Sequence, residues 1–265
     1  MSEGRDYWER TFRERNEIIF AAYGDTEPSG YVQAFSWSDR IRLPGACSVS
    51  FPPIHKTSNP PRHARDEWLH LSIGLSQPLD KKQVDQDRAA GKAYSSHGFE
   101  FGILTDTKAS WPSDLLYLLL TATTDGENIG WGDRFPFRFH TQTVDSIRVM
   151  IGGMKEIKPE PVGKLRALLF WPYLFPDFEF CTDTGKFLVM IATGITQKEW
   201  NAAKATTTEH LLLLLCRAGI HQRTIPDREC VFADSRWTQE WEKISTRDPK
   251  DVYAELTTLA RRNTR

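Results

Sequence analysis

The sequence predicts a globular protein that mixes helices with mainly antiparallel β-strands, on three observations. Residues 5–22 place apolar side chains at helical spacing with charges between them, which is typical of an amphipathic helix. Residues 68–75 and 98–104 alternate apolar and polar side chains, the pattern of half-buried strands. A leucine-rich helix is expected from Trp111-Pro112, because proline suits the first helical turn. We expect the two strands to pair antiparallel and this helix to pack on them, with Trp111 buried.

The remaining elements are predicted from the same kinds of pattern. The polar residues 76–97, between the two strands, predict a mobile loop. Thr196 and Glu199 form a capping-box pattern, which predicts the start of a helix. Core strands are expected at 162–171 and 186–195, and further helices at 208–218 and within 237–262.

The overall charge gives no general attraction to nucleic acid or to anionic membranes. The 265 residues include 34 basic and 35 acidic side chains, a net charge of −1. The longest apolar runs, among them 115–120 and 211–216, are six residues each, whereas about 20 are needed to cross a bilayer. The first residues contain no apolar segment of the signal-peptide type. We therefore expect a cytoplasmic protein without nucleic-acid or membrane partners.

The sequence contains no catalytic or cofactor-binding motif. It lacks the glycine-rich phosphate loops and the His-Glu-x-x-His zinc motif. The four cysteines are scattered without a Cys-x-x-Cys pair, so they are expected to be free thiols. Gly74-Leu75-Ser76 begins like a nucleophile elbow, but Pro78 stands where the last glycine is required. We expect no cofactor, no bound metal and no catalytic residue.

Four residues are candidates for partner binding: His70, Glu100, Trp131 and Asp133. His70 is either a base or a structural residue on the less apolar face of its strand. Glu100 stands between two phenylalanines, so we expect it on an open strand face, either solvated or lining a peptide groove. Asp133 follows a glycine-rich turn and either caps that turn or acts as a functional acid. Trp131 either packs inside or marks an interface.

Three stretches, taken in order, resemble the Suppressor of fused-like domain family. They are DEWLHLSIGLS at 66–76, SHGFEFGIL at 96–104 and SWPSDLLYLLLTATTDGENIGWGDRFPF at 110–137. A weaker match continues to the glycine at 219. The chain departs from the family at Arg134, where the family has histidine. It is similar to a compact, bacterial-type member.

The resemblance implies an α+β fold of mixed, mainly antiparallel sheets flanked by helices. It implies an N-terminal helix and lead-in at 1–44, the Suppressor of fused-like domain at 45–220 and a C-terminal helical extension at 221–265. Animal members clasp a transcription-factor peptide that adds a strand in a groove. Bacterial members are thought to include immunity proteins against secreted toxins. Strand edges with aromatic and carboxylate side chains suit such peptide addition.

The leading hypothesis is a non-catalytic module that sequesters a protein partner, extended to an immunity protein whose partner is a cognate toxin domain. Two alternatives stay open. One is a small-molecule hydrolase that uses His70, Glu100 and Asp133; the other is a regulatory interaction protein without a toxin partner. A hydrolase requires these side chains to converge in a concave pocket, whereas a binding protein requires an exposed edge or apolar patch.

Overall fold

A computed structural model describes most of the chain, and its residues form two compact units that interleave along the sequence. The first unit contains residues 1–103, 107–127 and 177–190; the second contains 104–106, 128–176 and 191–265. Within them, the described residues are 2–23, 32–34, 47–53, 65–78, 81–124, 126–136, 164–174 and 179–262. The ranges 1–44, 45–220 and 221–265 expected from the family resemblance stay a prediction.

The sheet of the first unit has the strand order β1-β2-β3-β4-β8, and β7 also pairs with β8. β2 pairs antiparallel with both β1 and β3, with Val49 opposite Leu71 in the second pair. The last residues of β4 and the second half of β8 belong to the second unit. The strands are β1 (Val32–Ala34), β2 (Cys47–Phe51), β3 (Trp68–Ile73), β4 (Tyr94–Thr105), β7 (Glu179–Thr182) and β8 (Gly185–Thr196).

The predicted pairing of the first two long strands is confirmed. β3 and β4 are hydrogen-bonded neighbours. The amide of His97 donates to the carbonyl oxygen of Leu75, and the amide of Phe101 donates to the hydroxyl of Ser72. From His97 to Phe101 the residue number rises along β4, whereas that of the partner falls from Leu75 to Ser72, as antiparallel strands require.

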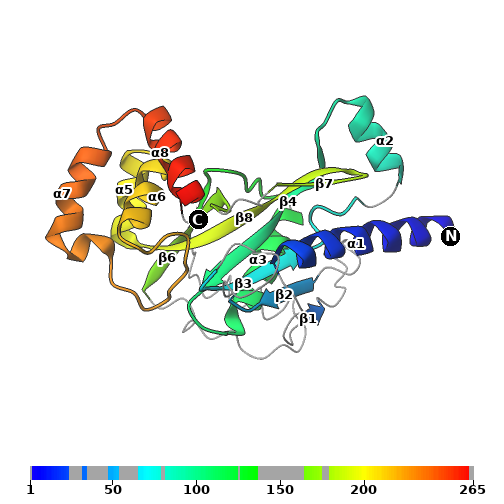
Figure 1. The fold of residues 1–265 in the computed structure, drawn as a ribbon, viewed down its shortest axis with the longest axis horizontal. Helices are drawn as coiled ribbons and strands as arrows, with labels where there is room; N and C mark the ends of the chain where they lie inside the picture. The colour runs from blue at the N-terminus through cyan, green and yellow to red at the C-terminus, as the bar shows by residue number, and fades with distance from the viewer. Residues whose placement is uncertain are drawn as a thin grey trace. The chain divides into compact units, whose positions relative to one another are not determined.

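Three helices accompany this sheet (Figure 1): α1 (Ser2–Tyr23), α2 (Lys81–Ala89) and α3 (Trp111–Thr124). α1 buries Thr11, Arg15, Ile19 and Tyr23, which recur every four residues and so share one face of the helix. The ring of Tyr23 lies 6.2 Å from that of Phe51 on β2, between centroids. α3 packs against β2 and β3, so the predicted packing of this helix on β3 is confirmed.

Two expectations for this unit are wrong. The polar segment 76–97 includes the helix α2, whose only buried side chain is that of Val84, so a single apolar anchor suffices for this short charged helix. Trp111 is only partly buried, whereas Pro112 and Ser113 are buried in the same helical turn. The periodicity identified the helix, but the first residue of a helix has no intrahelical neighbour before it and its side chain can turn outward.

The second unit contains the strand order β8-β6-β5 and a group of four helices, coloured yellow to red in Figure 1. The strands are β5 (Arg134–Pro136) and β6 (Leu165–Pro172), and β5 pairs antiparallel with β6. The helices are α5 (Gln197–Ala205), α6 (Thr208–Arg217), α7 (Ser235–Ile244) and α8 (Pro249–Arg262), with a short 3₁₀ turn at Val231–Ala233.

The charged tail forms two helices with a break between them. Asp248 ends the break, because its carboxylate accepts a hydrogen bond from the amide of Lys250 at 2.8 Å. Pro249 then occupies the first position of α8, where its missing N–H costs nothing. The helical content predicted for this tail is confirmed, and the local capping residues determine where it is interrupted.

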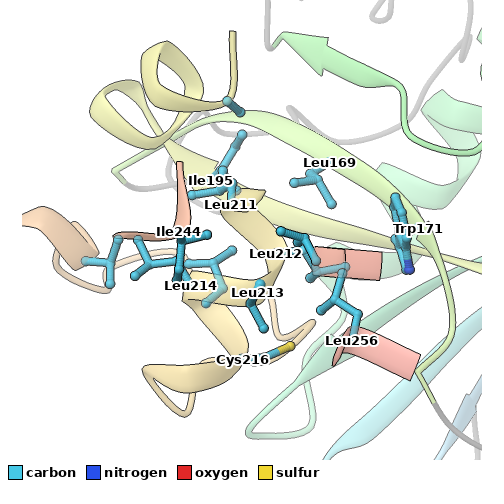
Figure 2. Packing of buried hydrophobic residues seen from close by; sticks show 14 of the residues in the cluster. Leu169, Trp171, Ile195, Leu211, Leu212, Leu213, Leu214, Cys216, Ile244 and Leu256 are labelled. Carbon is cyan, nitrogen blue, oxygen red and sulfur yellow. The ribbon is translucent and has the colours of Figure 1, made fainter. Parts of the chain in front are cut away.

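The leucine run of α6 forms the centre of the second unit's core (Figure 2). Leu211, Leu212, Leu213, Leu214 and Leu215 are all completely buried. Consecutive residues point in different directions around a helix, so burial of all five means that this helix is covered on every side. The core also takes side chains from β6, β8, α7 and α8, among them Leu169, Trp171, Ile195, Ile244 and Leu256.

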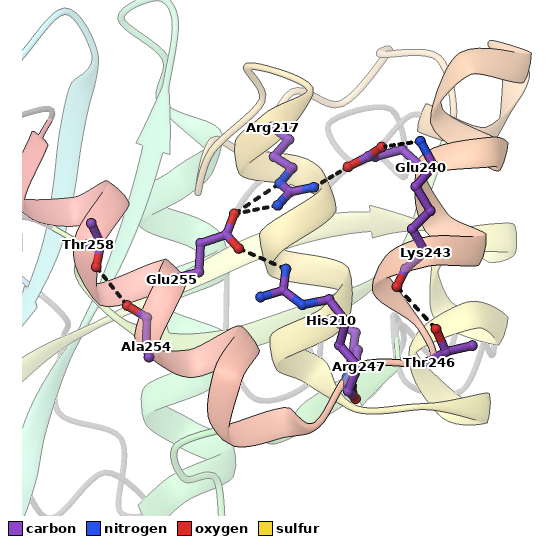
Figure 3. Close-up of polar contacts among 9 residues, drawn as sticks. All are labelled: His210, Arg217, Glu240, Lys243, Thr246, Arg247, Ala254, Glu255 and Thr258. Carbon is purple, nitrogen blue, oxygen red and sulfur yellow. Dashed lines mark hydrogen bonds and ion pairs between the residues drawn. The ribbon is translucent and has the colours of Figure 1, made fainter.

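Polar contacts on the surface join the three last helices (Figure 3). The guanidinium of Arg217 on α6 donates to Glu255 on α8, with 3.1 Å between Nε and Oε1, and also to Glu240 on α7. The second oxygen of Glu255 accepts from Arg247 at 2.8 Å. Exposed ion pairs contribute little singly, but this network joins three elements that follow one another in sequence.

A buried ion pair fixes the start of α5. The carboxylate of Glu199 accepts from the amide of Thr196 at 2.8 Å, which is the predicted capping contact. The same carboxylate is bound by the guanidinium of Arg228 at 2.5 and 2.6 Å and by the amide of Val231 at 2.8 Å. These contacts lower the pKa of the Glu199 carboxyl despite its burial, which acts in the opposite direction.

Within the described residues, no helix is both long and apolar enough to span a membrane.

Candidate functional site

Glu100 lies in the interior of the first unit and holds a turn. Its carboxylate accepts from the hydroxyl of Ser72 at 2.8 Å and from the amides of Gly74 at 3.0 Å and Leu75 at 3.3 Å. It also accepts from the amide and the hydroxyl of Ser76, at 2.9 and 2.7 Å. Five donors thus converge on two oxygens, which suits an ionised carboxylate because that group is acceptor-only.

The expectation that Glu100 occupies an open strand face is wrong. Its side chain is fully buried. Burial raises the pKa of this carboxyl, and the hydrogen bonds from Ser76, Gly74 and Ser72 oppose that rise. Burial lowers the pKa of the Arg15 guanidinium, and the negative charge of Glu100 opposes that lowering. Sequence alternation assigned Glu100 to one face of β4, but it could not show that this face is covered.

His70 is also fully buried. It lies on β3, where every side chain from Leu69 to Ile73 is buried, so neither face of the strand is open. Its Nδ1 lies 2.8 Å from the hydroxyl of Ser50 on the neighbouring strand. Burial lowers the pKa of His70 to about 4, and the nearby Arg65 acts in the same direction. His70 is therefore neutral at pH 7 and forms part of the sheet interior.

Trp131 and Asp133 lie in an exposed turn of the second unit. The amide of Gly130 donates to Oδ2 of Asp133 at 2.7 Å, and the amide of Asp133 donates to the carbonyl of Gly130 at 3.2 Å. Gly132 has a φ of +84°, which favours glycine. Its amide donates to the carbonyl of Phe170, and its carbonyl accepts from the hydroxyl of Thr208 at 2.6 Å. Asp133 thus caps the turn, and β6 and α6 hold that turn in place.

The turn presents an aromatic cluster made of Trp131, Trp171 and Tyr253. The ring centroids of Trp131 and Trp171 are 5.5 Å apart, and Tyr253 lies 6.1 Å from each. Trp171 is buried, whereas 50% of Trp131 and 43% of Tyr253 are exposed. A rigid aromatic pair that stays exposed is the type of feature that protein interfaces use.

The structure separates the four predicted residues into two groups. His70 and Glu100 belong to the interior of the first unit, and Trp131 and Asp133 to a surface turn of the second. The hydrolase alternative required His70, Glu100 and Asp133 to converge. Instead, the carboxylate of Glu100 is occupied by donors from residues 72–76 and that of Asp133 by the amide of Gly130. Among the described residues, no group of three or more His, Cys, Asp or Glu side chains is arranged to hold a metal ion.

Sequence reasoning missed Tyr253. Its helix, α8, buries Val252 and Leu256 and partly buries Leu259, which are four and three residues apart and define the inward face. Tyr253 lies next to that stripe, at the boundary between the inward face and solvent. A large aromatic residue at such a boundary was the available signal, but only the folded chain shows that it meets Trp131.

Comparisons with known proteins identify the fold. No family model matches the sequence, and no curated protein matches it either. A solved structure described as the Sufu-Fu complex matches with a TM-score of 0.59 at 16% identity, over 90% of this chain and 98% of that one. The chain has the Suppressor of fused-like fold. The predicted α+β class of this type is confirmed.

Two further solved structures share the fold. Suppressor of Fused from Drosophila has a TM-score of 0.51 at 18% identity, over 77% of this chain but only 47% of that one. A putative SUFU homolog from Neisseria gonorrhoeae has a TM-score of 0.51 at 15% identity, over 84% of this chain and 96% of that one. This chain therefore spans about half of the Drosophila protein and nearly all of the bacterial one.

Proposed function

We propose that this protein is a non-catalytic module that sequesters a protein partner, and that it contacts the partner through the turn Gly130–Asp133 and Tyr253. The observation that carries the proposal is the pair Trp131 and Tyr253, two large exposed aromatic side chains whose rings lie 6.1 Å apart and so form one contiguous apolar surface of the type that marks interfaces. The fold supports it, because a protein of this fold is described in a complex, that of Sufu with Fu.

The finer proposal is a bacterial immunity protein that acts in the cytoplasm and whose partner is a cognate toxin domain. It is supported by the likeness to a bacterial protein of almost the same length. In this proposal, Trp131 and Asp133 touch the partner. His70 and Glu100 act indirectly, since they are buried and hold β3 and the turn that follows it.

Co-expression tests the finer proposal directly. Each protein encoded by the two genes adjacent to that of this chain is expressed with and without it, and growth and complex formation by size-exclusion chromatography are measured. We expect one neighbour to inhibit growth, this chain to restore growth, and the two purified proteins to co-elute as a complex.

Matched variants locate the contact. Trp131→Ala should weaken the complex at least tenfold, because removal of a central aromatic residue typically costs more than about 1.4 kcal/mol. Tyr94→Ala is the control, because Tyr94 is 40% exposed but belongs to the first unit. If a neighbour binds without being toxic, the chain is a regulatory interaction protein. If Trp131→Ala and Tyr94→Ala bind equally well, the assigned surface is wrong.

A further inference from the structure

Basic side chains of the same chain cover several, but not all, of the partly buried tryptophan rings in the described residues. Three partly buried tryptophans each have a basic side chain positioned over the ring, within the distance at which cations and aromatic faces attract. These pairs are Lys108 over Trp68 at 5.6 Å, Arg134 and Lys204 over Trp200 at 6.0 and 5.8 Å, and Arg236 over Trp237 at 4.3 Å.

Trp131 differs from these three. It is the most exposed of the large hydrophobic side chains in the described part of the chain. Its described ring contacts are to Trp171 and Tyr253, and no lysine or arginine among the described residues lies over its ring or that of Tyr253. The faces of these two exposed rings are thus left without the kind of cation that covers Trp68, Trp200 and Trp237.

A carboxylate adds to this negative character. Asp133 belongs to the same four-residue turn as Trp131, and its side chain is exposed. One carboxylate oxygen accepts from the amide of Gly130, and no ion pair to Asp133 is formed by the described basic residues. Its negative charge therefore remains unneutralised beside the aromatic pair. The hydrogen bond from the amide of Gly130 holds the carboxylate in place within the turn.

We propose that Trp131, Tyr253 and Asp133 bind the guanidinium group of an arginine side chain on the protein partner. The inference rests on the proposed function and names the chemistry of the contact. A guanidinium is planar and weakly hydrated, so it can stack on an aromatic face while donating hydrogen bonds to a carboxylate. An aliphatic side chain at the same place would strip water from Asp133 and give it no partner.

A peptide titration followed by NMR tests the proposal without the natural partner. The probe is acetyl-Gly-Ser-Arg-Ser-Gly-amide, added to the full chain labelled with ¹⁵N. Each of the nine tryptophans contributes one indole N–H signal, and that of Trp131 is assigned by its disappearance in Trp131→Phe. We expect the arginine peptide to shift the Trp131 signal with a dissociation constant on the order of millimolar, as suits a single side-chain contact.

Matched peptides separate charge from shape. In the citrulline peptide the guanidinium is replaced by a neutral urea group of nearly the same shape, so its binding should be at least about threefold weaker. The lysine peptide should also bind less well than the arginine peptide, because its ammonium is more strongly hydrated and cannot stack as a plane. The leucine peptide should cause no saturable shift.

Variants test each contact. Asp133→Asn keeps an oxygen for the amide of Gly130, and should weaken arginine binding about two- to fivefold and reduce its dependence on salt. Tyr253→Ala should weaken it about twofold, whereas Tyr94→Ala in the first unit should leave it unchanged. A thermal melt of each variant checks that the fold is retained.

Three results would overturn the inference. They are equal binding of the arginine and citrulline peptides, preferred binding of the leucine peptide, and no shift of the Trp131 signal at a peptide concentration 20 times the expected dissociation constant. None of them affects the co-expression test, so the surface can still bind a partner by other chemistry. Conversely, arginine binding with no protein partner found among the neighbours would support this contact and contradict the immunity role.

Discussion

Two turns in this protein are each closed by a carboxylate, and they differ in burial and in the number of donors that bind the carboxylate. Glu100 binds the turn at Gly74–Ser76 inside the first unit, and Asp133 binds the turn at Gly130–Asp133 on the surface of the second. Five donors surround Glu100, whereas one backbone amide binds Asp133. The chemistry of the contact is the same in both: an acidic side chain accepts hydrogen bonds from backbone N–H groups near glycine.

The difference in burial assigns different roles to the two carboxylates. A buried charge is stable only when its hydrogen-bonding capacity is filled, so Glu100 has none left for a partner and its loss leaves several donors unsatisfied. An exposed carboxylate is solvated in any case, so Asp133 can exchange water for a partner at little cost. Stability should therefore depend on Glu100 and binding on Asp133. Three measurements test this division, and a fourth tests the burial of His70 in the same unit as Glu100.

The largest effect is expected for Glu100→Gln. The amide group of Gln places N–H donors against the donors of Ser76 and Gly74, and the charge that binds them is lost. The free energy of unfolding should fall by about 3 kcal/mol or more, since breaking a buried charged network is among the costliest substitutions. A urea melt measures this. A loss below about 1 kcal/mol would mean that the turn does not need the carboxylate.

The second effect is a pH dependence that originates at His70. Its pKa is about 4 in the folded protein, below the ordinary 6.5, so between these values the unfolded chain binds more protons than the folded one. Stability from His70 is therefore complete above pH 6.5 and is lost as the pH falls toward 4, by on the order of 3 kcal/mol. Urea melts from pH 4 to 7 should show a shallower pH slope for His70→Asn than for the wild type. Parallel slopes would contradict a buried, neutral His70.

The third effect is smaller and concerns a single donor. Ser76→Ala removes the hydroxyl that lies 2.7 Å from Glu100 and leaves the amide of the same residue in place. We expect a loss of about 1.5–3 kcal/mol in a urea melt, the usual cost of one hydrogen bond to a charged group. A loss as large as that of Glu100→Gln would show that the hydroxyl, and not the carboxylate, organises the turn.

The smallest effect on stability is expected for Asp133→Asn. The substituted side chain can still accept from the amide of Gly130, and the position is exposed, so the free energy of unfolding should change by less than about 0.5 kcal/mol. Partner binding should nevertheless weaken. A large loss of stability would erase the distinction between the two turns, because Asp133 would then be as structural as Glu100.

The sequence by itself determined most elements of secondary structure. Alternation in β3 and β4, the proline at the start of α3 and the capping pair Thr196 and Glu199 are local signals, and all of them correspond to elements of the fold. The resemblance to the Suppressor of fused-like family also came from residues in order along the chain. Local propensity, capping and period need only neighbours a few residues apart, so a single chain contains that information.

Only the tertiary structure decided which polar residues are covered. Alternation predicts that His70 and Glu100 face away from their apolar neighbours, but the face on which each of them lies is itself covered in the folded chain. The same holds for the contact of Trp131 with Tyr253, which are more than a hundred residues apart. Burial depends on what packs against a face, and that is a property of long-range contacts rather than of the pattern along one strand or turn.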